Sequence, residues 1–510
     1  MSLRRLLQIL LTGFVGQGLT VLSQLLVPPF FFKFYPSGIE VYGEWLALSA
    51  AVNYLGTLNY GIQSYASNQI TILYNGGDVP GARTVQASAL RLLLLIASFF
   101  AIAGLIVFVL PVAGWLRLRH VGPGAAAITL YLLILQISSN MFLSLLTNSY
   151  MAVGLLHRGN YISSAQRLLM ILSMATAIYF RASFPTLAAL QLASYVIFFG
   201  FALVDLRRIA PALVPRLSDG SWSTVRTILK PSGHFGLISV AGFLTWQGPI
   251  LVIVRVMGPA TVALFGVVRV VFQMSRQLLS MASSVFAQDI TLMVGRQDWP
   301  RLRRLYDLSE RLVLFLIPVV SIGSLLLCPL LFTVWLHKPH LYQPELCFLM
   351  AIVSAVLGLK EHKTQFQSSS NEHEELSTFI LIGYSIMLGV SVPVMHRFGL
   401  PGFILTWLVW EIIQTAGVVR LNTRLFPAEH RFGKHLLWRF CGFIVAAFAA
   451  VAWPALREAH WSLPFGVASA CLISCLLAAA AWPTFQMTEL LRVLRERIHR
   501  RRLRSADAAS

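Results

Sequence analysis

The stretch LRLLLLIASFFAIAGLIVFVLPV, from Leu90 to Val112, carries one charged residue, Arg91, close to its beginning. A helix needs about 20 mainly apolar residues to cross the hydrocarbon core of a bilayer, and this stretch is long enough. Apolar runs of this kind recur from Leu6 almost to Pro483, separated by short polar breaks or by breaks with proline or glycine. Lipid is therefore the predicted solvent for most of the chain.

The composition agrees with this prediction. Only 12% of the 510 residues are charged, 57% are hydrophobic, and the mean hydropathy is +0.72. A soluble chain of this length would carry about a quarter charged residues. Backbone groups in lipid must be satisfied internally, and runs this continuous suit helices better than the alternating strands of a barrel. The predicted fold class is all-α, a polytopic membrane protein with no gap long enough for a soluble domain.

We expect about fourteen spans, two of them short. They are 6–32, 44–65, 90–112, 125–148, 168–180, 185–204, 235–256, 261–285, 312–336, 346–359, 376–394, 401–419, 436–454 and 463–482. The expected parts are an N-terminal six-helix lobe (1–210), a cytoplasmic linker (211–233), a second six-helix lobe (234–422), an accessory helix pair (423–484) and a basic cytoplasmic tail (485–510).

The distribution of basic residues predicts the orientation. Placing the N-terminus in the cytoplasm leaves nearly all lysines and arginines on the inner side, as the positive-inside rule demands. The sequence therefore predicts a multi-pass membrane protein with both termini cytoplasmic. The net charge of +20 belongs beside membrane spans, so the expected partners are anionic membrane lipids and not nucleic acid.

Two distant segments resemble each other. Tyr42-Gly43 is followed by a helix and then by Asp78-Val-Pro-Gly-Ala-Arg83, whereas Phe265-Gly266 is followed by a helix and then by Asp298-Trp-Pro-Arg-Leu-Arg303. The two copies lie about 220 residues apart. If they mark a repeat, the two lobes have the same orientation, because six crossings return the chain to the same side. This is the parallel-repeat plan of a transporter whose lobes rock against each other.

These segments resemble the O-antigen flippases (Wzx type) of the multidrug/oligosaccharidyl-lipid/polysaccharide exporter superfamily. The resemblance covers most of 6–420 and is strongest at Tyr42-Gly-Glu-Trp45, at Tyr60-Gly61 and from Gly258 through Arg269 to the loop that begins at Asp298. It implies alternating access in a bacterial inner membrane, and as cargo an oligosaccharide linked to undecaprenyl diphosphate. A glycan polymerase and glycosyltransferases of the same pathway are then expected partners.

Two features depart from that family pattern. Wzx-type proteins are described with twelve spans, whereas the lipid II flippases of the same superfamily have fourteen. Lipid II flippases also place arginines in the first helix, where this chain has Gln17 and Gln24. A lipid II flippase therefore remains an alternative. A multidrug antiporter should carry acidic residues in the first and seventh spans, and neither span has one.

Ionisable residues inside membrane spans are the default candidates for a functional site, because a charge in lipid is costly. Arg269, Gln273 and Arg276 follow one face of the predicted eighth span at i, i+4 and i+7. Guanidinium groups offer fork-like donors to phosphate oxygens, so these residues are predicted to bind the diphosphate. The alternative for Arg276 is a pairing with a helix end or a side chain that reaches the interface.

Glu411 lies near the middle of the predicted twelfth span. It is expected either to carry a coupling ion or to provide a counter-charge for an arginine. Amide side chains suited to sugar hydroxyls complete the predicted substrate-binding set, although interhelical hydrogen bonding is their commoner use. They are Gln17, Gln24, Asn53, Asn140 and Gln247.

The sequence predicts no enzyme, cofactor or metal site. His362 and His373 lie among four glutamates in a predicted cytoplasmic loop, without the fixed spacing of metal ligands, and we expect a solvated face there. No Walker lysine loop, nucleophile elbow or zinc-protease helix occurs. A membrane glycan polymerase or ligase would need a large outer loop, and every predicted outer loop is short.

Overall fold

The computed structural model describes residues 3–53, 55–284, 286, 290, 293–294, 297–370, 374–427, 429, 433–456 and 463–488. Its regular elements within these ranges are helices, with no strand among them. The predicted all-α membrane fold is confirmed. The basic tail lies outside the described residues from Glu489 onward.

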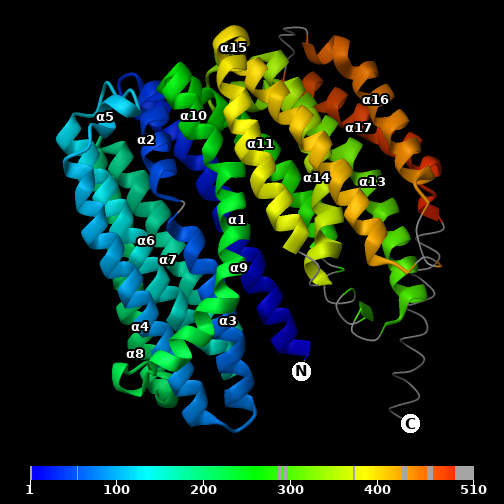
Figure 1. Cartoon of the computed structure of the whole chain (residues 1–510). Helices are drawn as coiled ribbons and strands as arrows, with labels where there is room; N and C mark the ends of the chain where they lie inside the picture. The colour runs from blue at the N-terminus through cyan, green and yellow to red at the C-terminus, as the bar shows by residue number, and fades with distance from the viewer. Residues whose placement is uncertain are drawn as a thin grey trace. The chain divides into compact units, whose positions relative to one another are not determined.

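The helices pack as two compact units, Met1–Val267 and Val268–Ser510 (Figure 1). The helices of the first unit are α1 (Leu3–Phe34), α2 (Gly38–Asn53), α3 (Leu55–Asn75), α4 (Val79–Gly104), α5 (Val112–Trp115), α6 (Pro123–Ala152), α7 (Leu156–Tyr179), α8 (Phe184–Ile209), α9 (Trp222–Trp246) and α10 (Gly248–Met257). The boundary falls inside α11 (Pro259–Ser284).

Helix α6 is the centre of the first unit, because it contacts α2, α3, α4, α7 and α8. Leu133, Ile137, Met141 and Leu145 follow one face at intervals of four residues, and all are buried. Helix α1 lies along α7, and α9 lies along α3 and α4. The segment 211–233, expected to link the lobes, contains two short 3-10 turns and the beginning of α9.

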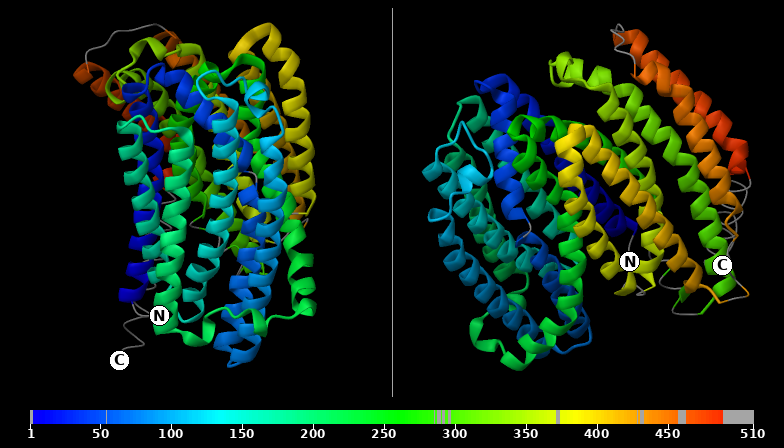
Figure 2. Two further views of the ribbon diagram at one scale, coloured as in Figure 1. Left: turned by 90° about the vertical axis from the view of Figure 1, so that its left-hand side faces the viewer. Right: turned by 45° about the horizontal axis from the view of Figure 1, so that its top comes forward.

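The second unit continues from α11 with α13 (Trp299–Leu330), α14 (Pro344–Ser369), α15 (Glu374–Leu425), α16 (His435–Leu456) and α17 (Leu463–Thr484). Helix α14 packs against both α13 and α15, so it occupies the interior of this unit. Helices α16 and α17, orange and red in Figure 2, both lie against α13.

Each of the fourteen predicted spans falls on a helix of the structure. Two interruptions occur within the described residues. Gly399, with φ of 63°, separates the two halves of α15 that correspond to the eleventh and twelfth spans. The second predicted span lies on α2 and α3, on either side of Tyr54, which lies outside the described residues. The seventh is divided into α9 and α10, which meet at Gln247. Pro249 in the first turn of α10 explains the last break, because proline has no N–H to continue the helical hydrogen bonds.

Within the described residues, nine helices are long and apolar enough to cross a membrane, by length and composition alone. Helix α10 is apolar but shorter, and of α1 only the part Gly18–Phe34 enters this comparison, because side chains before Gly18 lie partly outside the described residues. Helix α14 is not among the nine, because its second half carries several charged and amide side chains. The tenth predicted span ended at Leu359, but the helix continues for almost three more turns to Ser369.

The repeated sequence signals have the same structural role in both units. Asp78 caps α4 with φ, ψ of −85°, 71°, and Asp298 caps α13 with −83°, 68°. Each aspartate accepts a hydrogen bond from the backbone N–H three residues later, and each helix has proline in its first turn. The residues before them, Gly77 and Gln297, both have positive φ. The two aspartate signals therefore begin equivalent helices.

Candidate substrate-binding site

Helix α11 carries the predicted cationic stripe. Arg269, Gln273 and Arg276 are half-buried, and they lie on one side of the helix. The residues between them, including Val271 and Phe272, are buried at 5% and 2% exposure. An apolar face of α11 thus packs into the protein, while the stripe remains partly accessible.

Arg276 has a carboxylate partner that the sequence did not reveal. Its Nη1 donates to Oε1 of Glu361 on α14, and the two side chains are 15% and 30% exposed. The ion pair reduces the positive charge that Arg276 offers to a ligand. Arg269 lies about two helical turns away along α11, and it is then the stripe residue best suited to binding an anionic ligand.

Glu411 is fully buried in the second half of α15, and it forms an ion pair with Lys360 of α14. Its carboxylate also accepts from the hydroxyl of Tyr384 and from Nε1 of Trp407, 2.9 Å away. Lys360 donates to the hydroxyl of Tyr384 at 2.6 Å and to the amide oxygen of Gln414 at 3.0 Å. The structure therefore supplies a lysine where the sequence analysis considered an arginine as counter-charge.

A second buried ion pair lies one turn further along α14. Nζ of Lys363 donates to Glu310 of α13 and, at 2.8 Å, to the hydroxyl of Tyr306. Lys363 is 0% exposed and Glu310 4%. Asn422 of α15 donates to the carbonyl of Lys363 and accepts from Gln367 at 2.7 Å. Buried charges are tolerated only when paired and hydrogen-bonded, and this cluster meets both conditions.

The prediction of a solvated loop around His362 is wrong. Because α14 continues to Ser369, His362 is 1% exposed, and its Nε2 lies 2.9 Å from the hydroxyl of Ser309. His373 lies outside the described residues. Among the side chains that are described, no group of three His, Cys, Asp or Glu residues is suited to holding a metal ion.

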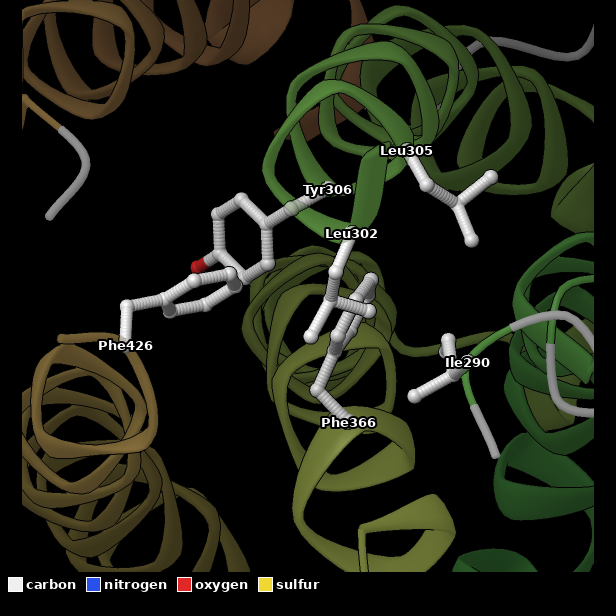
Figure 3. Packing of buried hydrophobic residues seen from close by; sticks show 6 residues of the cluster. All are labelled: Ile290, Leu302, Leu305, Tyr306, Phe366 and Phe426. Carbon is white, nitrogen blue, oxygen red and sulfur yellow. The ribbon is translucent and has the colours of Figure 1, made fainter. Parts of the chain in front are cut away.

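A cavity of about 550 Å³ lies where α13 begins and where α14 and α15 end. Its walls include Trp299, Leu302, Phe366 and Phe426, and an Arg424–Glu375 ion pair stands at its rim. Figure 3 shows the rings of Tyr306 and Phe426 together beside Leu302, in the packed cluster that borders this cavity. None of the predicted binding residues lines the cavity.

The amide residues predicted in the first unit are dispersed. Gln24 is half-buried on α1, Asn53 is exposed at the end of α2, and Asn140 is half-buried on α6. Gln247 is half-buried at the break between α9 and α10. The side chain of Gln17 lies outside the described part. Among those described, none is hydrogen-bonded to another, so the structure does not bring them together as one amide site.

Three cations inside helices were not predicted from the sequence, namely Lys360, Lys363 and Arg167. The two lysines follow the apolar run of α14 directly, and they were assigned to a loop because charge was taken as the end of the span. Helical spacing gave a usable signal, since Lys360, Lys363 and Gln367 occupy one face and Phe366 continues the buried pattern. Arg167 stood one residue before the short fifth span, although α7 begins eleven residues earlier at Leu156.

Comparisons with solved structures reveal the same architecture in several transporters. An inward-facing multidrug-resistance transporter of the MATE family aligns with a TM-score of 0.62 and 14% identity, and the alignment covers 79% of this chain and 98% of its own. The MATE multidrug transporter DinF-BH aligns with a TM-score of 0.61 and 16% identity, over 83% of this chain and 96% of its own. The lipid II flippase MurJ, in an inward closed conformation, aligns with a TM-score of 0.62 and 10% identity, over 93% of this chain and 98% of its own.

The chain has the fold of MOP-superfamily transporters. No family model and no curated protein matches its sequence. At these identities the likeness shows the MOP fold alone. The Wzx subfamily is therefore a matter for proposal, as are the cargo and the site.

Proposed function

We propose that this chain is a flippase that moves an oligosaccharide linked to undecaprenyl diphosphate across a bacterial inner membrane by alternating access. The observation that carries the proposal is the partly accessible stripe on α11, with Arg269, Gln273 and Arg276 on one face of a membrane helix. A cationic face within a membrane span favours an anionic cargo. Guanidinium matches phosphate oxygens in geometry as well as charge.

The distribution of acidic residues supports an anionic cargo over a cationic drug. Within α1, α9 and α10, the helices of the first and seventh predicted spans, no acidic residue occurs. In the second unit, Glu310, Glu361 and Glu411 each form an ion pair with a lysine or arginine. Carboxylates engaged in this way are poorly placed to receive a cation.

A lipid II flippase is the second candidate, and a specific observation supports it. MurJ covers 93% of this chain, whereas the two multidrug transporters cover 79% and 83%. Both candidates involve a sugar carried on a polyprenyl diphosphate, and they differ in the sugar.

The surroundings of the chain follow from this proposal. Both termini lie in the cytoplasm, where anionic lipids contact the basic loops and the basic tail. A polymerase and glycosyltransferases of the same pathway are the proposed protein partners. Glu411 either holds a coupling ion or serves as counter-charge to Lys360, and its contact with Lys360 supports the second role.

The test is a flipping assay in proteoliposomes with fluorescent polyprenyl-diphosphate oligosaccharides. We expect flipping by the wild type, a loss of roughly tenfold to a hundredfold in rate for Arg269→Ala, and partial recovery for Arg269→Lys, which keeps the charge but loses the fork. Arg304→Ala is the matched control, because Arg304 is exposed at the beginning of α13. Export of a cationic dye without flipping of any diphosphate-linked sugar would contradict the proposal.

A further inference from the structure

Arg167 stands in the interior of a membrane helix of the first unit. Helix α7 spans Leu156–Tyr179 and is apolar enough to cross a bilayer. At a rise of about 1.5 Å per residue, Arg167 lies roughly 17 Å from the first residue of α7, near the middle of a bilayer. Its side chain is half-buried. A guanidinium at this depth is costly unless the protein or a ligand compensates its charge.

The partners of Arg167 are neutral. Its Nη1 donates to the carbonyl of Gly16 on α1 at 2.6 Å and also to the hydroxyl of Thr20. The helices approach closely here, since a Cβ on Gly16 would lie 3.3 Å from the hydroxyl of Ser164. Among the described residues, Nε and Nη2 of Arg167 have no hydrogen-bond acceptor. Part of the guanidinium fork is therefore available.

No carboxylate in the first unit compensates this charge. Glu40 and Glu44 face His120, and Asp205 is held by Arg158 and Tyr150. Asp78 caps α4, and Asp219 lies in the turn before α9. These five are the only acidic residues before Val268, and within the described structure none forms an ion pair with Arg167. The cation thus keeps its full charge.

A second polar group stands on the same face of α1. Gly16, Thr20 and Gln24 are spaced by four residues, so they lie one above the other along the helix. The side-chain oxygen of Gln24 is buried, and it has no hydrogen-bond partner in the described part of the chain. A buried amide oxygen without a donor is a costly arrangement that a ligand hydroxyl would relieve.

We propose that Arg167, Thr20 and Gln24 form a second phosphate-recognition site, in the first unit, that binds the diphosphate of the cargo and a hydroxyl of its first sugar. This inference rests on the proposed function and adds a site that is separate in sequence from the stripe on α11. Arg167 provides the charged donors for a phosphate oxygen. Gln24 accepts a hydrogen bond from the adjoining sugar.

The experiment measures binding by purified full-length protein in nanodiscs. The probes are undecaprenyl diphosphate and undecaprenyl monophosphate. We expect Arg167→Gln to weaken diphosphate binding by roughly tenfold to a hundredfold and to reduce the preference for diphosphate over monophosphate. Arg167→Lys should recover part of the affinity but little of the preference. Arg207→Gln is the charge-matched control, because Arg207 is exposed at the end of α8.

The melting temperature without ligand separates this role from helix packing. If Arg167→Gln lowers the melting temperature but leaves the affinity and the preference unchanged, Arg167 only joins α7 to α1 and the inference is overturned. If Arg167→Gln does not fold, Arg167→Lys decides, and an unchanged preference overturns the inference. If only Arg269→Ala loses binding, this second site fails while the proposed function stands. If wild-type protein binds neither probe, the proposed function fails as well.

Discussion

Asp78 in the first unit and Asp298 in the second begin their helices with nearly the same dihedral angles, yet the helices that follow enclose different charges. In the second unit, Lys360 and Lys363 each meet a buried glutamate. In the first unit, Arg167 meets only neutral oxygens. The two units therefore begin these helices in the same way, but their interior cations have different partners, carboxylates in the second unit and neutral oxygens in the first.

Contacts near the ends of two interior helices show a further difference between the units. In the first unit, the hydroxyl of Tyr150 on α6 donates to Asp205 on α8 at 2.6 Å. In the second unit, Gln367 on α14 donates to Asn422 on α15 at 2.7 Å. Each contact is a hydrogen bond near the end of an interior helix, but only the first involves a charge. The Tyr150 contact thus engages a carboxylate directly, whereas the Gln367–Asn422 contact joins two neutral amides.

The strongest test of this comparison removes one member of a buried ion pair. Lys363→Met leaves Glu310 buried without its cation, and breaking such a pair costs about 3–5 kcal/mol. We expect a large fall in the melting temperature and in the yield of folded protein in detergent. The double change Lys363→Met with Glu310→Leu should recover most of the loss. A single variant as stable as the wild type would show that this charge pair does not hold the second unit together.

A smaller effect is expected at the glycines of the two repeated aromatic-glycine signals. A Cβ on Gly43 would lie 1.8 Å from the carbonyl oxygen of Pro259, whereas one on Gly266 would lie 2.6 Å from the end of the Leu46 side chain. Backbone cannot give way as a leucine can, so Gly43→Ala should cost about 1–3 kcal/mol and Gly266→Ala less. Thermal unfolding of the two variants under the same conditions checks the order. Equal losses of stability in the two variants would contradict the expectation that the backbone at Pro259 yields less easily than the Leu46 side chain.

The smallest effect concerns the two capping aspartates. Asp78→Ala and Asp298→Ala should each cost about 1 kcal/mol, because each removes one hydrogen bond to the first turn of its helix. The conservative changes to asparagine should cost less, since asparagine is also a good N-cap. Hydrogen exchange of the first turns of α4 and α13 measures the loss locally. Unequal exchange in the two alanine variants would break the equivalence of the caps.

The sequence predicted the membrane fold well, because length and apolar composition are properties of whole segments. The helix breaks were less predictable. The interruption between α9 and α10 had a local cause in Pro249, but proline also occurs inside helices of this chain, at Pro28 and Pro318, without ending them. The repeat was recognisable because capping depends on an aspartate at one position followed by proline in the first turn, which is a local requirement.

The candidate site was predictable only in part. The spacing of Arg269, Gln273 and Arg276 placed them on one helix face, and the structure shows them half-buried there. The partners of Arg276 and Glu411 lie 85 and 51 residues away, and nothing in local spacing specifies such contacts. Charges near the ends of apolar runs, such as Lys360, were mistaken for loop residues because hydropathy cannot tell a buried pair from an exposed one.

The ion pairs of α14 have a consequence for how the chain enters the membrane during its synthesis. Lys363 finds Glu310 on a helix that has already been made, whereas Lys360 must wait for Glu411, which is 51 residues further along. At about 5–20 residues per second, that interval lasts roughly 3–10 seconds. A lysine at the centre of an inserting helix costs about 2.5–3.5 kcal/mol during this time. We therefore expect α14 to enter the bilayer with an uncompensated charge, and to reach its full stability only when the ribosome has delivered the second half of α15.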